Sequence, residues 1–177
     1  MRQHRQSLSA SEQQQASERF ARAFAAQWRL RGARHIGLFL AADGELDPLP
    51  GLLTLDGLSR QLYLPVLPKS TDAVLQFVRW QPGEALIPNR YGIGEPVLKR
   101  RALTPLWRLD LLLMPLVAFD DEGNRLGMGG GFYDRALANL QTRPHRPRLI
   151  GVAHAFQRVE RLPTAPWDQP LDGVITG

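Results

Sequence analysis

A continuous apolar run at residues 111–119 is the feature of this sequence that most constrains its fold. Only Pro115 interrupts the run. Strands that are covered on both faces of a parallel sheet have this composition, whereas half-exposed strands alternate apolar and polar residues. A glycine-rich turn follows, and residues 132–140 then have a helical pattern. The sequence therefore predicts a buried central strand that leads through a glycine-rich turn into a helix.

Helical and strand-like segments alternate along the rest of the chain. Ser9 and Glu12 have the spacing of a capping box and predict a helix that runs to Leu30, before Gly32. Further strands are expected at 35–40, 61–67, 73–80, 148–153 and 173–176, a short helix at 48–58, and a long ordered loop at 84–104. We therefore expect an α/β fold: one domain over residues 1–177, with a central, mostly parallel sheet flanked by helices.

Composition narrows the possible functions. The chain has no cysteine, which excludes disulfides, thiolate metal sites and cysteine nucleophiles. Its 22 Lys and Arg residues exceed its 17 Asp and Glu residues, and the net charge of +5 favours anionic ligands. Residues 1–15 lack the apolar core of a signal peptide, and the apolar stretch at 109–119 is too short to span a bilayer. We expect a cytoplasmic monomer with no membrane partner.

The expected sheet also predicts where ligands bind. In open α/β sheets, ligands lie at the carboxyl ends of the strands, which points to residues 41–45, residues 120–134 and the region around Asp168. Glycines allow close approach of the backbone to a ligand, and the helix start that follows them favours a phosphate. Arg125 can bind phosphate oxygens with two donors, and Asp120 and Asp134 can supply oxygen ligands to Mg²⁺. The four glycines before the helix are Gly127, Gly129, Gly130 and Gly131.

This glycine-rich turn matches neither the P-loop nor the dinucleotide-binding pattern, and alone it is equally typical of a tight strand-to-helix connection. However, Asn124-Arg-Leu-Gly-Met-Gly-Gly-Gly-Phe-Tyr-Asp-Arg135, preceded by Pro115-Leu-Val-Ala-Phe-Asp120, resembles the signature of the 5-formyltetrahydrofolate cyclo-ligases, or methenyltetrahydrofolate synthetases. The resemblance extends over nearly the whole chain. Its other parts are Leu8-Ser-Ala-Ser-Glu-Gln13, Phe39-Leu40, Asp43-Gly-Glu-Leu-Asp47, Leu62-Tyr-Leu-Pro65, Pro88-Asn-Arg-Tyr-Gly-Ile-Gly-Glu-Pro96, Leu162-Pro163 and Trp167-Asp168.

The resemblance implies an activity, a fold and a set of ligands. The activity is the ATP- and Mg²⁺-dependent conversion of 5-formyltetrahydrofolate into 5,10-methenyltetrahydrofolate, with release of ADP and phosphate. The implied fold is similar to that of sugar-phosphate isomerases and CoA transferases. The implied partners are 5-formyltetrahydrofolate and ATP, with no nucleic acid.

The resemblance also assigns residues. Arg125 is the implied catalytic residue, Asp134 and Asp168 the implied Mg²⁺ ligands. The implied folate-binding residues are Leu40, Glu45, Tyr91 and Phe132. The implied ATP-binding residues are Arg2, Arg5, Arg125, Gly127, Met128, Gly129, Gly130, Gly131, Phe132 and Tyr133.

This sequence departs from the family at three points. The basic segment before the first helix is shorter than in many members, which leaves the ATP contacts of Arg2 and Arg5 open. Met128 and Gly130 stand where some relatives have basic residues. Phe132 replaces a tyrosine and lacks its hydroxyl.

Other interpretations stay open at this point. Asp134 also suits an ordinary helix start, Asp168 an exposed turn, and Tyr91 and Phe132 a hydrophobic core. Related α/β folds include isomerases and transferases that need no ATP hydrolysis. Another interpretation is a basic nucleic-acid-binding domain, although the arginines are dispersed and no nucleic-acid-binding motif is present. None of the four histidines lies in the signature, so none is assigned a catalytic role.

Overall fold

The computed structural model describes residues 1–27, 30, 32–54, 60–68, 74–98, 102–138, 140–143, 145–165 and 168–177. The predicted ends of the first helix, of the helix at 48–58 and of the strand at 73–80 fall partly outside these residues. Within this part of the chain, no helix is long and apolar enough to cross a membrane.

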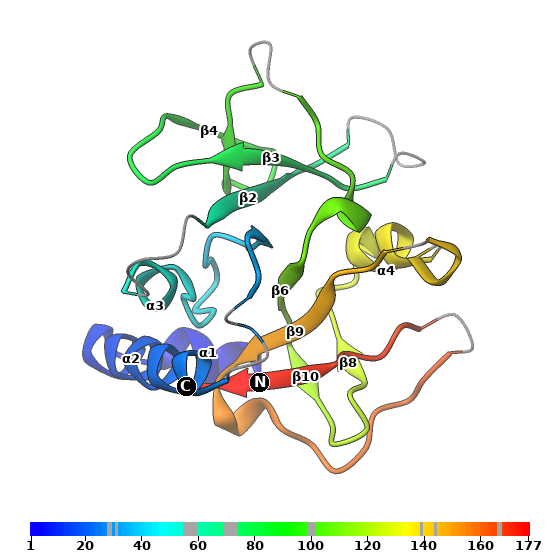
Figure 1. The fold of residues 1–177 in the computed structure, drawn as a ribbon. Coiled ribbons are helices and arrows are strands. Elements are labelled where there is room, and N and C mark those ends of the chain that lie inside the picture. Colours follow the sequence, from blue (N-terminus) through cyan, green and yellow to red (C-terminus); the bar gives the residue numbers. More distant parts are fainter. Residues whose placement is uncertain are drawn as a thin grey trace.

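A six-stranded sheet forms the centre of the molecule, in the order β10-β9-β6-β1-β2-β3 (Figure 1). All neighbouring strands are parallel except β2 and β3, which are antiparallel. The mostly parallel sheet predicted from the sequence is therefore confirmed. The strands are β1 (His35–Gly37), β2 (Gln61–Val66), β3 (Gln76–Trp80), β6 (Leu111–Pro115), β9 (Arg148–Ala153) and β10 (Gly173–Thr176).

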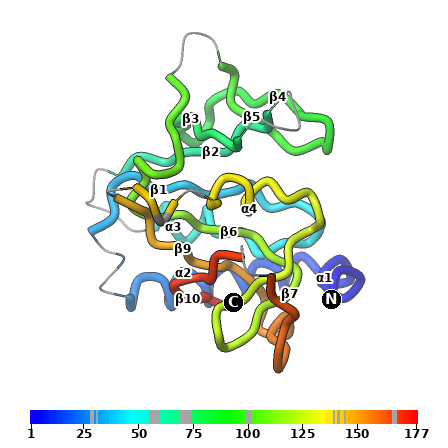
Figure 2. The backbone as a smooth tube through the Cα atoms, turned by 90° about the vertical axis from the view of Figure 1, so that its right-hand side faces the viewer, coloured from blue at the N-terminus to red at the C-terminus, as the bar shows by residue number. Residues whose placement is uncertain are grey.

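Two apolar clusters cover the two faces of the sheet. Leu111 and Leu113 of β6 belong to the cluster that includes Phe20 of helix α2 (Ala10–Ala26). Leu112 and Met114 point to the opposite face, into the cluster that includes Leu137 of helix α4 (Phe132–Leu137). Figure 2 shows α2 and α4 on opposite sides of β6. Successive side chains of a strand alternate between faces, so burial of both faces accounts for the continuous apolar run.

Helix α2 begins as the sequence predicts. The Ser9 hydroxyl accepts a hydrogen bond from the Glu12 N–H, and the Glu12 carboxylate accepts one from the Ser9 N–H at 2.8 Å, which completes the capping box. The helix ends at Ala26, earlier than the predicted Leu30, with Gln27 as its C-cap. The remaining helical segments are α1 (Arg2–Ser7), α3 (Leu49–Leu53) and the 3-10 turns at Leu106–Arg108, Leu140–Thr142 and Ala155–Gln157.

The strand β1 and the helix α4 end at Gly37 and Leu137, before the predicted ends at 40 and 140. Two other segments contain hairpins that were not predicted. The strand predicted at 111–119 ends at Pro115; after a short break, β7 (Ala118–Phe119) forms an antiparallel hairpin with β8 (Arg125–Leu126). The loop predicted at 84–104 contains a second hairpin, formed by β4 (Leu86–Pro88) and β5 (Gly94–Pro96). Both hairpins lie outside the main sheet and carry residues of the candidate site.

Candidate active site

The glycine-rich loop connects β8 to α4 and presents its backbone to solvent. Residues 126–130 are exposed, and a Cβ atom at Gly127 or Gly129 would meet no neighbour within 4 Å. Gly129 and Gly131 have positive φ values of 85° and 61°, which side chains other than glycine rarely adopt. The loop is therefore open to close approach by a ligand.

Arg125 is fixed at the base of this loop. Only 7% of its side chain is exposed. One of its terminal nitrogens donates to the Gln169 carbonyl at 2.6 Å, and the other donates to the Asp134 carboxylate. These bonds join the β7–β8 hairpin, the start of α4 and the segment that follows Asp168. The guanidinium is therefore held in place before any ligand binds.

Of the two aspartates expected to bind a metal, Asp134 pairs with this arginine, and Asp168 precedes Gln169, whose carbonyl accepts a hydrogen bond from Arg125. Asp134 is half-exposed and pairs with Arg125. Asp168 is exposed, and its carboxylate accepts a hydrogen bond from the Ala165 N–H at 2.8 Å. Among the described residues no group of three or more His, Asp or Glu side chains is placed to hold a metal. One or two carboxylates with substrate phosphates are the usual Mg²⁺ ligands, so the donor set fits that ion.

The sequence also suggested Asp120 as a cation ligand. In the structure, its carboxylate instead stabilises the turn between β7 and β8. Its buried carboxylate accepts hydrogen bonds from the N–H groups of Glu122, Asn124 and Leu162 and from the Asn124 amide. Burial opposes ionisation of Asp120, but these hydrogen bonds outweigh it and keep the pKa of the carboxyl below its ordinary value. With both oxygens accepting bonds from the protein, Asp120 holds the β7–β8 turn to the segment at Leu162.

We expect Asp120→Asn to lower the free energy of unfolding by about 2 kcal/mol near neutral pH, because it removes charge-assisted hydrogen bonds. A carboxyl with a lowered pKa in the folded state contributes stability above its unfolded pKa and loses it as pH falls through the folded value. The difference from the wild type should therefore shrink in acid. Urea unfolding at neutral and acidic pH measures it. The control is Asp121→Asn, at an exposed neighbour paired with exposed Arg158; equal losses in both variants would contradict the role of Asp120.

Glu45 lies in the loop that follows β1. Its carboxylate is 10% exposed and accepts a hydrogen bond from the Ala42 N–H at 3.1 Å. Burial raises the pKa of Glu45, against the hydrogen bond from Ala42 and the charge of Arg5. Burial also raises the pKa of Tyr133, the nearby Glu45 carboxylate raises it further, and the Arg125 guanidinium opposes both. The charges of Glu45 and Arg125 therefore act on the Tyr133 hydroxyl in opposite directions.

The β4–β5 hairpin brings an aromatic residue to the same region. Tyr91, in the turn of this hairpin, is 59% exposed, so the core-packing interpretation does not apply to it. Its ring meets the Phe132 ring edge-to-face, with 6.3 Å between the ring centroids. Leu40 lies beneath the hairpin, where a Cβ on Gly94 would be 3.5 Å from its methyl carbon. Of the expected folate residues, Tyr91 and Phe132 are thus in contact, and Leu40 adjoins the same hairpin.

The two N-terminal arginines contact the loop at residues 41–45. Arg5 is 1% exposed; it donates to the Asp43 carbonyl and carboxylate at 2.9 and 2.8 Å and to the Leu116 carbonyl at 3.3 Å. Arg2 is about half-exposed and donates to the same carboxylate at 2.9 Å. Their assignment to ATP stays a prediction.

Sequence reasoning missed Asp43, which is central to these contacts. Asp43 has a positive φ of 53° and accepts hydrogen bonds from Arg2, Arg5 and Gln6. The Asp43-Gly44 pair is a turn signal in the sequence, but nothing in the sequence indicates that α1 packs on it. The positions of Arg90 and Arg135 near Phe132 were also missed.

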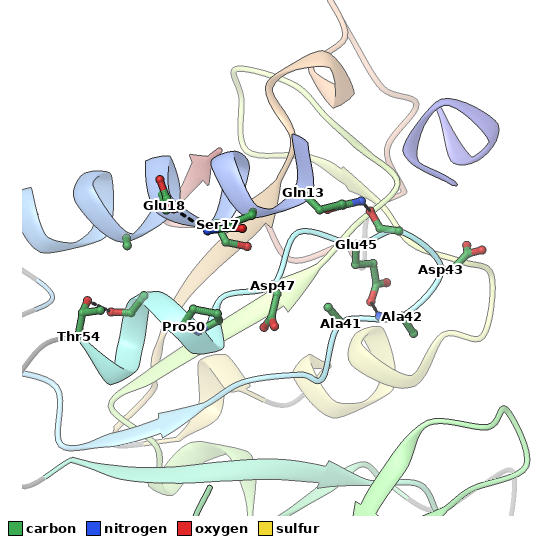
Figure 3. Close-up of a pocket in the computed structure, with 14 residues that line it drawn as sticks. Gln13, Ser17, Glu18, Ala41, Ala42, Asp43, Glu45, Asp47, Pro50 and Thr54 are labelled. Atoms are coloured by element: carbon green, nitrogen blue, oxygen red, sulfur yellow. Dashed lines mark hydrogen bonds between the residues drawn. The ribbon is translucent and has the colours of Figure 1, made fainter. Parts of the chain in front are cut away.

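A groove of about 620 Å³ lies between α2 and the segment from Ala41 to Thr54 (Figure 3). Its charged lining is acidic: Glu18, Asp43, Glu45 and Asp47. Figure 3 shows Glu45 turned toward the Ala42 N–H at one end of the groove. The glycine-rich loop does not contribute to this lining, so the candidate site is defined by the hydrogen bonds of Arg125 and by the contact between the Tyr91 and Phe132 rings rather than by this groove.

Comparisons with known proteins identify the family of this chain. A model of the 5-formyltetrahydrofolate cyclo-ligase family matches residues 1–177. The 5-formyltetrahydrofolate cyclo-ligase of Escherichia coli is 43% identical over 99% of this chain and 96% of that protein, and that of Haemophilus influenzae is 41% identical over 100% and 94%. The solved 5,10-methenyltetrahydrofolate synthetase of Aquifex aeolicus superposes with a TM-score of 0.79, at 30% identity over 98% of this chain and 84% of that one. The synthetase of Mycoplasma pneumoniae, at 22% identity and a TM-score of 0.75, shares the fold. The chain therefore belongs to the 5-formyltetrahydrofolate cyclo-ligase family and is an enzyme of the ligase type.

Proposed function

We propose that this enzyme converts 5-formyltetrahydrofolate into 5,10-methenyltetrahydrofolate, using ATP and Mg²⁺ and releasing ADP and phosphate. The observation that carries the proposal is the Arg125 guanidinium, held by Asp134 and the Gln169 carbonyl at the base of an exposed glycine loop. Residues 1–177 act in this proposal as one catalytic domain.

ATP binds through the glycine-rich segment. The N–H groups of the loop at Gly127, Met128, Gly129, Gly130 and Gly131 and at Phe132 and Tyr133 surround the phosphates, and Arg125 supplies a fixed cation. Such a preorganised donor set stabilises charge on a transferred phosphoryl group without reorganising during the reaction. Arg2 and Arg5, which meet at Asp43, are proposed as further ATP contacts at the N-terminal side.

Asp134 and Asp168 are the proposed Mg²⁺ ligands. Asp134 already balances the charge of Arg125, and the Gln169 carbonyl places the Asp168 segment against the same guanidinium. When bound, the ion neutralises phosphate charge during transfer. The carboxylates of Asp134 and Asp168 would hold the ion, and oxygen ligands of this kind suit Mg²⁺.

The folate binds between the Glu45 loop and the β4–β5 hairpin. The Glu45 carboxylate accepts hydrogen bonds from N–H groups of the pterin ring. Leu40 provides an apolar contact, and Tyr91 and Phe132 contact flat rings of the substrate. This placement orients the formyl group toward the phosphate bound at Arg125.

The reaction then needs positioning rather than a protein nucleophile. The formyl oxygen attacks the terminal phosphorus of ATP, and ADP leaves. N10 attacks the formyl carbon, which the phosphate has made electrophilic; the carbon–oxygen bond then breaks, phosphate leaves, and the N10 proton passes to solvent. Alignment of the two substrates and neutralisation of phosphate charge account for most of the acceleration.

Release of ADP tests this proposal against the other reactions of related folds. We expect ADP formation to require 5-formyltetrahydrofolate and to occur once for each folate consumed. An isomerase or a CoA transferase would consume its own substrate without ATP. ADP release that is independent of folate, or absent, contradicts the proposal.

We expect Asp134→Asn to raise the Mg²⁺ concentration for half-maximal activity by about tenfold, because the variant loses one anionic ligand and about 1.4 kcal/mol of ion binding. Activity should recover in part at saturating Mg²⁺. The measurement is initial rate against Mg²⁺ at fixed ATP, with Asp121→Asn as an exposed control. An unchanged titration would remove Asp134 from the metal site.

We further propose that the enzyme acts in the cytoplasm as a monomer, without a nucleic-acid or membrane partner. The absence of cysteine and the dispersed arginines support this setting. A salt-sensitive gel shift with RNA or sedimentation as a dimer would contradict it.

A further inference from the structure

Two arginines surround the aromatic contact between the β4–β5 hairpin and α4. The guanidinium carbon of Arg90 lies 5.2 Å from the centre of the Tyr91 ring and 5.7 Å from that of Phe132. The guanidinium carbon of Arg135 lies 5.2 Å from the centre of the Phe132 ring. We call these four residues, Arg90, Tyr91, Phe132 and Arg135, the rim cluster.

The cations of the rim cluster have no anionic partner among the described residues. Arg135 donates to the Gly130 carbonyl at 3.1 Å, and the contacts of Arg90 with described residues are those with the two rings. The neighbouring Asp134 is engaged with Arg125. Both arginines are exposed. Two like charges that share one aromatic ring repel each other, and an anion bound between them removes that repulsion.

The turn that carries Arg90 is already ordered. The Asn89 side-chain oxygen accepts hydrogen bonds from the N–H groups of Tyr91 and Ile93 at 2.8 and 3.2 Å. The Asn89 amide donates to Glu95 at 2.9 Å. The rim cluster is therefore displayed on a turn with a defined backbone, and binding there costs less ordering entropy than binding to a loose loop.

The identity of the anion follows from the proposed function, on which this inference rests. The reacting formyl group must lie beside the phosphates at Arg125, which is mostly buried, and the pterin lies toward Glu45. The other end of a folate is a benzoyl ring followed by glutamate, so this end extends toward the exposed rim. We propose that Arg90 and Arg135 bind the glutamyl carboxylates of the folate, while Tyr91 and Phe132 contact its benzoyl ring.

The test uses substrates that differ only in their glutamates: 5-formyltetrahydropteroate, which has none, the monoglutamate, and a γ-linked polyglutamate. We expect Arg90→Gln and Arg135→Gln each to raise the KM for the glutamylated substrates about three- to tenfold, because each variant loses charge-assisted bonds at an exposed site. The KM for the pteroate, the KM for ATP and kcat should change little. Arg→Lys at either position should restore part of the loss.

A matched control is Arg108→Gln, at an exposed arginine whose guanidinium carbon lies 5.3 Å from the centre of the Trp107 ring. This variant should leave all three KM values unchanged. Raising the salt concentration should increase the wild-type KM for the polyglutamate more than that of either rim variant, since salt screens exposed charges.

Three results would overturn the inference. An equal rise in KM for the pteroate would mean that the arginines only shape the hairpin, a rise confined to ATP would place the phosphates there, and unchanged values would leave the arginines without a role in binding. If the wild type forms no product, the proposed function fails instead. The same three compounds are then compared by calorimetry, where equal affinities for the wild type and the variants would reject the rim cluster separately.

Discussion

Replacing Arg125 by alanine is expected to lower kcat/KM by about a hundred- to a thousandfold, the usual effect of removing one preorganised donor from a charged transition state. The guanidinium is mostly buried, and its two bonds fix it between Asp134 and the Gln169 carbonyl. No water can supply an equally fixed positive charge at that position. The loss should appear mainly in kcat, since the charge acts on the phosphoryl group during transfer.

Stability should change much less than activity in this variant. The substitution removes the hydrogen bond to Gln169 and the partly exposed pair with Asp134, which together contribute about 1–2 kcal/mol. Arg125→Lys keeps the charge but not the paired donors, and we expect activity between the wild type and alanine. Steady-state kinetics with unfolding curves for all three proteins separate the two effects. Wild-type kcat in the alanine variant would remove Arg125 from the reaction.

Replacing Arg5 by alanine is expected to lower the free energy of unfolding by about 3 kcal/mol, because removing one partner of a buried ion pair leaves the other charge poorly compensated. The guanidinium of Arg5 joins α1 to Asp43 and to the Leu116 carbonyl just after β6. Arg2→Ala is the matched control, since Arg2 binds the same carboxylate but is 55% exposed. Arg2→Ala should lower the free energy of unfolding by less than about 1 kcal/mol.

Urea unfolding of the two variants measures this difference, and the KM for ATP in each shows whether either arginine also binds nucleotide. A large stability loss only in Arg5→Ala supports a structural role for the buried arginine. Equal stability in the two variants would contradict that structural role, and a higher KM for ATP in either variant would support the proposed contact of that arginine with the nucleotide.

The sequence predicted the layers of the fold because both faces of β6 are buried. Leu111 and Leu112 belong to opposite clusters, so the strand could not alternate apolar and polar residues. The direction of β3 was beyond this reasoning, because β3 is the edge strand of the sheet and its direction depends on the connection from β2. The β4–β5 hairpin was missed because each of its strands has three residues, and Pro88, Gly94 and Pro96 indicate a loop.

The site was predictable where its residues are close in sequence. Arg125 and Asp134 lie in one segment, and the structure pairs them. Contacts between distant segments were not predictable: Gln169 on Arg125, Glu45 near Tyr133, and Arg90 over Phe132 each depend on the tertiary fold. Helix α1 was missed for a similar reason. It has no apolar face, and its buried residue is the charged Arg5.

Formation of the methenyl product tests the central claim most directly. The protein is mixed with 5-formyltetrahydrofolate, ATP and Mg²⁺, and the absorbance band of 5,10-methenyltetrahydrofolate is followed. We predict a rise that requires all four components and that Arg125→Ala nearly abolishes. A folded protein that gives no rise with Mg²⁺ and both substrates in excess, or a rise that does not need ATP, would contradict the account.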